Sequence, residues 1–167
     1  MKYLVCILGA SPPPIRGPHR LAPPADLESA SRTIETVKAA IPYILVGPPI
    51  VRYGPGGEVH VDVPLMYHDL ALDRVHYDPV SRTPSPKGRP VHVRGVRVDV
   101  GEVKAVMTAI LKEVRVIDAP EFREPEVARV APLAWRSLII AHVKVSYVGR
   151  ELIPDYGLTE EIRRYVV

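Results

Sequence analysis

The fold of this chain is decided by residues 58–78, which read EVHVDVPLMYHDLALDRVHYD. Apolar and polar residues alternate near both ends of this stretch, which is the period of a half-buried β-strand. We therefore predict strands over 58–66 and 70–78, joined by a turn centred on His68. Such a hairpin is the natural beginning of an antiparallel sheet.

A third segment, Val91-His92-Val93-Arg94, repeats the pattern of Val59-His60-Val61-Asp62 and Val75-His76-Tyr77-Asp78. The three histidines are sixteen residues apart each time. Folding the hairpin about His68 places His60 opposite His76 and Asp62 opposite Arg74, and folding about Pro84 places His92 opposite His76. We therefore expect three imidazoles in a row on one sheet face, with His76 in the middle and a bulge at Gly95.

This polar face has the residue types of a divalent-metal site. Facing residues on neighbouring strands are close enough for two imidazoles to share one ion, with a carboxylate completing the set. The candidate ligands are His60, Asp62, His76 and Asp78, and the candidate bases beside a metal-bound water are His68 and Asp73. The alternative is an ordinary solvated strand face, because the spacing matches no known zinc signature.

Two segments have the apolar spacing of amphipathic helices, 26–41 and 102–114. Asp26 is the expected N-cap of the first, and Asp99 with Glu102 forms a capping box before the second. A strand is expected over 137–147 and a short closing helix over 159–165. We predict one α+β domain over 1–167, in which an antiparallel sheet of 58–66, 70–78 and 91–100 is covered by the two principal helices.

Two proline-rich segments interrupt these elements. Residues 11–25 are expected to form an extended loop or arm, and residues 79–90 a loop rich in basic residues. The region from 79 to 97, which we call the basic loop, holds no acidic residue and is a candidate phosphate-binding surface. Its cationic side chains are Arg82, Lys87, Arg89, Arg94 and Arg97.

Residues 86–90 of the basic loop, PKGRP, resemble the core of an AT-hook, a short minor-groove binding segment. The resemblance covers five residues, and Lys87 replaces the first arginine. We carry over no AT-hook function.

The composition is unusual, because the 167 residues include no asparagine and no glutamine but nineteen prolines. Loss of amide side chains is typical of proteins from hyperthermophiles. It also excludes any chemistry that needs a side-chain amide, such as bidentate reading of adenine. One cysteine excludes an intrachain disulfide, and the apolar residues 1–10 are too short to span a bilayer. These features favour a cytoplasmic protein.

Three functions follow as hypotheses. The leading one is a non-enzymatic nucleic-acid-binding or assembly protein that contacts RNA or DNA phosphates through the basic loop and has no bound cofactor. The first alternative is a metal-dependent hydrolase or nuclease that uses the His/Asp cluster at 60–78. The second alternative is a structural subunit, either a homo-oligomer or part of a larger complex. The sequence names no substrate or target.

Overall fold

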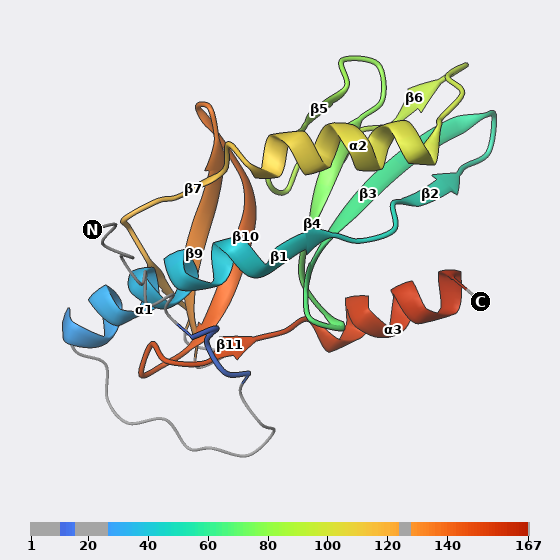
Figure 1. Cartoon of the computed structure of the whole chain (residues 1–167). Coiled ribbons are helices and arrows are strands. Elements are labelled where there is room, and N and C mark those ends of the chain that lie inside the picture. Colours follow the sequence, from blue (N-terminus) through green and yellow to red (C-terminus); the bar gives the residue numbers. More distant parts are fainter. Residues whose placement is uncertain (1–10, 16–26, 124–127, 167) are drawn as a thin grey trace, which may run out of the picture.

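The computed structural model describes residues 11–15, 27–123 and 128–166. Within these ranges the chain forms three α-helices and two curled antiparallel sheets (Figure 1). The helices are α1 (Leu27–Ala40), α2 (Val100–Leu111) and α3 (Tyr156–Tyr165). A 3₁₀ turn, Ile41–Tyr43, links α1 to the first strand.

The first sheet, which we call the N-terminal sheet, is built around the long strand β3 (Glu58–Tyr67). One edge of β3 pairs with β1 (Ile44–Val46) and β2 (Ile50–Tyr53), and the other with β4 (Leu70–Asp78). Strand β5 (Thr83–Pro84) extends the sheet beyond β4, and β6 (Val93–Arg94) pairs with the first residues of β3.

The second sheet, the C-terminal sheet, is centred on the hairpin of β9 (Ala128–Trp135) and β10 (Leu138–Ser146). Strands β7 (Arg115–Val116) and β8 (Glu121–Arg123) pair with β9, and β11 (Leu152–Ile153) pairs with β10. The two sheets meet where β10 runs beside β4 (Figure 1).

One continuous apolar core joins both sheets. It takes the odd-numbered residues of β3, such as Val61 and Val63, together with α2 and the inner side chains of β9 and β10. Helix α3 lies against the opposite face of the N-terminal sheet, where Leu158 and Ile162 pack on Ile50 and Ala71. The alternation along β3 therefore separates a core face from a polar face that α3 covers in part.

The mixed α+β class and the antiparallel pairing are confirmed, but the predicted cover of one sheet by two principal helices is not confirmed. Helix α1 packs on β9 and β10, α2 lies along β1, and α3 is a third helix on β4 (Figure 1). The second sheet was missed because all eight residues of β9 are buried. A strand buried on both faces has no polar–apolar alternation to reveal it.

The predicted hairpin register is wrong by two residues, although it places the histidines on the correct face. Asp62, and not His60, lies opposite His76, and Val61 lies opposite Tyr77. The turn is His68–Asp69 with His68 at φ 53°, and an irregularity in the pairing follows at Leu65/Met66. A shift of two residues preserves the face of every side chain, whereas a shift of one would reverse it.

Residues 91–100 are not a full strand of the sheet. Only Val93–Arg94 pairs, and it pairs with β3, so the predicted position of His92 opposite His76 is also wrong. Gly95 has φ 69° and lies just after the end of the strand, so it is no bulge within one. Helix α2 begins two residues earlier than predicted, and the Asp99 side chain accepts the Glu102 N–H as expected of its N-cap.

The described parts of both proline-rich segments are fixed by hydrogen bonds. Pro13 O accepts from Tyr67 Oη, and Ile15 bridges Leu152, whereas residues 16–25 and the expected N-cap Asp26 lie outside the described residues. In the basic loop, β5 pairs with β4, and Lys87 N donates to Ile139 O of the C-terminal sheet. The loop therefore spans the junction of the two sheets.

Candidate functional site: a histidine–aspartate cluster on β3 and β4

The polar face of the N-terminal sheet converges on one buried carboxylate, Asp62 of β3. Its side chain is only 2% exposed. Strand pairing places His76 of β4 opposite Asp62 and Arg52 of β2 opposite His60, so all of these side chains share one face. Arg74 of β4 lies one position farther along the same face. We call these residues, together with Glu161 of α3, the Asp62 cluster.

Two imidazole nitrogens converge on the same oxygen of Asp62. His76 Nδ1 lies 2.7 Å and His60 Nε2 lies 3.0 Å from Oδ1. These three ligand atoms all lie within 4.8 Å of one another. Around tetrahedral zinc, neighbouring ligand atoms are about 3.4 Å apart, because each lies about 2.1 Å from the ion. Small side-chain movements would therefore bring the set to metal-binding distances.

The other oxygen of Asp62 is held by two arginines. Arg52 Nη1 donates to Oδ2 at 3.0 Å and Arg74 Nη1 at 3.1 Å. Each guanidinium also pairs with Glu161, and Arg74 Nη2 lies 2.9 Å from Glu161 Oε2. The two acids and two arginines balance in charge, and they tie α3 to the sheet.

The orientation of the His60 ring determines whether a proton or a metal ion is needed between its Nε2 atom and Asp62. His60 Nδ1 is 3.0 Å from Val91 O, and a carbonyl oxygen only accepts, so Nδ1 carries a hydrogen. A neutral ring would then present the lone pair of Nε2 to a carboxylate oxygen at 3.0 Å. Two acceptors at that distance need a proton or a metal ion between them. A carbonyl that fixes the outer nitrogen is the usual arrangement for a metal-binding histidine.

The surroundings keep Asp62 ionised. Burial by itself would raise the pKa of this carboxyl. The hydrogen bond from His76, the charges of His60 and His76 and the hydrogen bond from Arg74 outweigh burial, so the pKa lies well below its ordinary value. The carboxylate is thus in the ionised form that a metal ligand requires, and each imidazole would have to lose the proton of its ligating nitrogen on binding an ion.

The remaining residues of the predicted metal site are placed elsewhere. Asp78 Oδ1 accepts the backbone N–H groups of Val80 and Ser81 in the turn after β4. His68 is in the hairpin turn and stacks edge-on against Tyr67. Asp73 pairs with Lys87 and accepts the backbone N–H of His142. The structure thus brings together His60, Asp62 and His76, but not Asp78, His68 or Asp73.

The third repeated histidine does join the row, in a different order. The His92 ring stacks on His60 with centroids 5.1 Å apart, and His60 and His76 are 5.6 Å apart. His60, and not His76, is therefore the middle ring, because β6 pairs with β3.

The basic residues of the predicted phosphate-binding surface do not form one patch. Three are paired with acids: Arg82 with Glu102, Lys87 with Asp73, and Arg94 with Glu58. Among the described residues Arg89 and Arg97 have no carboxylate partner, and both are exposed. The Arg94 pair also lowers the pKa of Glu58.

Two members of the Asp62 cluster were not candidates from the sequence, Arg52 and Glu161. Arg52 follows the apolar pair Ile50–Val51, and only the pairing of β2 with β3 shows that it reaches Asp62. Glu161 is nearly one hundred residues from Asp62, and its position between Glu160 and Ile162 in a helix gave no signal of a partner on the sheet.

No family model matches this chain, and neither the curated proteins nor the solved structures contain a match. Among the described residues no helix is long and apolar enough to cross a membrane.

Proposed function

We propose that this protein is a metal-dependent hydrolase that binds one divalent ion of the zinc type through His60 Nε2, Asp62 Oδ1 and His76 Nδ1. The observation that carries the proposal is the convergence of both imidazoles on one carboxylate oxygen, with Val91 O holding the outer nitrogen of His60. Three protein ligands with a fourth position left for water is the composition of catalytic zinc sites.

The reaction class follows from the fourth coordination position of the ion, which is left for water. A water bound to such an ion ionises near neutral pH and attacks an ester or phosphoester centre. The side chains of His60 and His76 are 13% and 15% exposed, against 2% for Asp62, so the imidazoles form the side of the cluster that lies nearer to solvent. Arg52, whose side chain is 43% exposed, lies at the rim and would favour an anionic substrate.

The two arginines also limit how tightly the ion is held. Their charges oppose a cation, and the carboxylate of Glu161, which pairs with both, offsets them in part. We therefore expect an affinity below that of structural zinc sites, with dialysis against excess chelator removing the ion.

The test is elemental analysis of protein purified without a histidine tag, before and after dialysis against zinc. One equivalent of metal in the wild type, lost in His60→Ala and in His76→Ala, is the expected result. His68→Ala is the matched control, because it removes an imidazole from the turn and not from the cluster. A wild type that takes up no zinc, manganese or cobalt would overturn the proposal.

Hydrolysis is measured separately, with bis(4-nitrophenyl) phosphate as a probe. The metal-loaded wild type is expected to release nitrophenolate, and the His76→Ala variant is not. If the protein binds metal but hydrolyses neither this probe nor a matching carboxyl ester, the hydrolase function is refuted and only metal binding is supported.

Nucleic-acid binding through the basic loop is supported by one observation, the exposed guanidinium groups of Arg89 and Arg97, which have no carboxylate partner within the described part of the chain. Two phosphate contacts give a weak dependence of affinity on salt. This function therefore stays the second candidate.

A further inference from the structure

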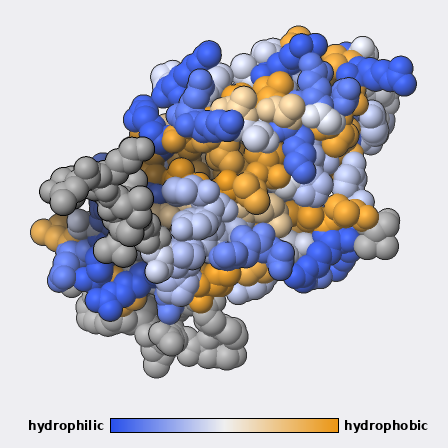
Figure 2. Space-filling model, viewed as in Figure 1, coloured by the Kyte–Doolittle hydropathy of each residue, from blue (hydrophilic) through white to orange (hydrophobic). Residues whose placement is uncertain are grey.

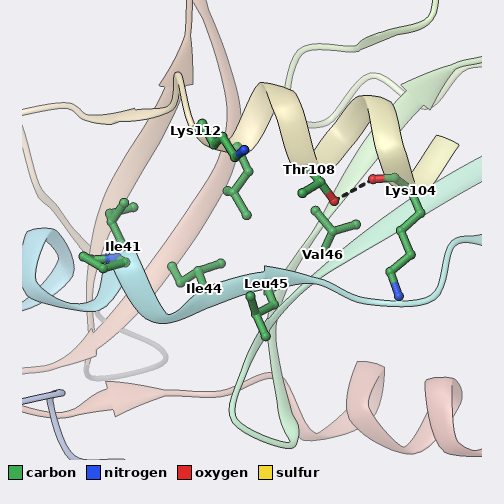
Figure 3. A pocket seen from close by; sticks show the side chains of 9 residues that line it. Ile41, Ile44, Leu45, Val46, Lys104, Thr108 and Lys112 are labelled. Carbon is green, nitrogen blue, oxygen red and sulfur yellow. Dashed lines mark hydrogen bonds between the residues drawn. The ribbon is translucent and has the colours of Figure 1, made fainter. Parts of the chain in front are cut away.

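A groove of about 470 Å³ lies between β1 and α2, and it shares no residue with the Asp62 cluster (Figure 3). Its walls are apolar and come from Ile41, Ile44, Leu45 and Val46 on one side and Leu111 on the other. Leu45 is 67% exposed, a large fraction for an apolar residue in a strand. Figure 2 shows the apolar surface here with hydrophilic side chains on either side.

The charged groups of the groove are Lys104 of α2 and Lys112, the C-cap residue that directly follows this helix. Lys104 and Lys112 lie at opposite ends of the groove in Figure 3. Among the described residues neither ammonium group has an acidic partner, in contrast to most cations of the N-terminal sheet. The hydroxyl of Thr108, which lies between them, is already donated to Lys104 O. The groove therefore offers positive ends and an apolar middle.

The strand that borders the groove has a free edge. Within the described part of the chain β1 pairs with β3 alone. Gly47 N donates to Pro64 O, and hydrogen-bonded pairs alternate along an antiparallel ladder, so the backbone groups of Ile44 and Val46 point away from β3. Ile44 N–H is used by Ile41 O, which leaves Ile44 C=O and both groups of Val46 for another strand.

We propose that this groove binds an extended peptide of a partner protein, which adds a strand to β1 and carries an acidic residue, an apolar residue and an acidic residue at alternate positions. The spacing supports this pattern. Lys104 and Lys112 are eight residues apart on a helix, which is about 12 Å. Two residues four apart on a strand are about 13 Å apart and point to the same face, with the apolar residue midway between them.

A second copy of this chain is a poorer occupant. Pairing β1 with β1 would bring four lysines together with no acid between them, and like charges at an interface are destabilising. Edge-strand addition to a partner of opposite charge uses the same backbone groups without that cost.

The probe is a fluorescent seven-residue peptide with glutamate at positions two and six, valine at position four and threonine elsewhere. Fluorescence anisotropy with the full chain is expected to show saturable binding. Lys104→Ala and Lys112→Ala are each expected to weaken it about fivefold, as for an exposed ion pair at the upper end of the usual range. The control Arg164→Glu, on α3, is expected to bind as the wild type does.

Two further arms separate this mode from simple charge attraction. The double variant Lys104→Glu/Lys112→Glu is expected to reject the glutamate peptide and bind its lysine counterpart. A glutamate peptide with an N-methyl group on the valine is expected to lose binding, because it cannot complete the backbone ladder. Equal binding of the methylated peptide would overturn strand addition. No binding by the wild type, or a dimer that Leu45→Lys dissociates, would overturn the proposal.

Discussion

The Asp62 cluster and the basic loop are the two polar regions of the N-terminal sheet, and they are organised in opposite ways. In the cluster, four cationic or imidazole side chains from three strands contact the two oxygens of Asp62, and two of them also contact the carboxylate of Glu161. In the basic loop, three cations pair with three separate acids, and two have no acidic partner among the described residues. Paired strands place the polar side chains of one face next to each other, so these side chains share one carboxylate. In the loop, each cation pairs with the acid that lies nearest to it.

The largest expected effect tests the centre of the cluster. Asp62→Asn removes the charge of a side chain that is 2% exposed and that faces two arginines and two histidines. We expect the free energy of unfolding to fall by about 3 to 5 kcal/mol, the usual cost of removing one partner from a buried ion pair. Chemical denaturation measures it. Asp78→Asn is the control, because its carboxylate caps an exposed turn and its loss costs about 1 kcal/mol or less.

Equal losses in the two variants would show that the cluster is no more stabilising than a surface turn. The comparison between the two regions would then fail at its strongest point.

The second effect tests whether the basic loop is anchored to the fold. Lys87 Nζ lies 2.6 and 2.7 Å from the two oxygens of Asp73, whose side chain is 12% exposed. Asp73 also accepts His142 N of the C-terminal sheet, so this ion pair spans both sheets. Lys87→Ala is expected to cost about 1 to 2 kcal/mol in the same denaturation experiment.

Arg89→Ala is the matched control in the same loop, and it is expected to change stability by no more than about 0.5 kcal/mol. A similar, small effect for both variants would mean that Lys87 is as free as the sequence suggested.

The third effect is a pH dependence at the same junction. Burial, with the nearby charges of Arg123 and Lys87, lowers the pKa of His142 below its ordinary value of 6.5. Arg123 Nη2 lies 3.1 Å from His142 Nδ1 and can only donate, so the folded state holds the neutral ring. The unfolded chain then binds the proton more readily, and this contribution to stability is lost as the pH falls below 6.5.

Thermal unfolding between pH 8 and pH 5 checks this prediction. The wild type is expected to lose more stability over that range than His142→Phe does. Parallel curves for the two proteins would contradict it.

The smallest expected effect tests whether Arg89 and Arg97 of the basic loop bind nucleic-acid phosphates. Arg89→Glu with Arg97→Glu is expected to leave folding unchanged and to weaken any RNA or DNA binding, with the salt slope of the wild type reduced by about 2. Filter binding over a salt series measures it. Wild-type binding that is unaffected by both substitutions, or absent altogether, would remove nucleic-acid binding from the candidate functions.

The sequence by itself determined the hairpin of β3 and β4, the helices α1 and α2, and the face of that hairpin on which each histidine lies. The alternation of residues 58–78 predicted β3 and β4, and helical spacing with capping residues predicted α1 and α2. His60, Asp62 and His76 were placed on one face, because a strand period of two survives a register error of two. These features depend on neighbours in sequence, so a single chain reveals them.

Only the tertiary structure decided which of these residues meet. The pairing at Leu65/Met66 set the register that put Asp62 opposite His76, and the pairing of β6 with β3 moved His92 beside His60. Glu161 reached the cluster because the apolar face of α3 packs on Ile50 and Ala71. Lys87 forms an ion pair with Asp73 and is therefore not part of a free basic surface. Each outcome depends on contacts between distant segments, whose geometry is fixed by packing and not by local periodicity.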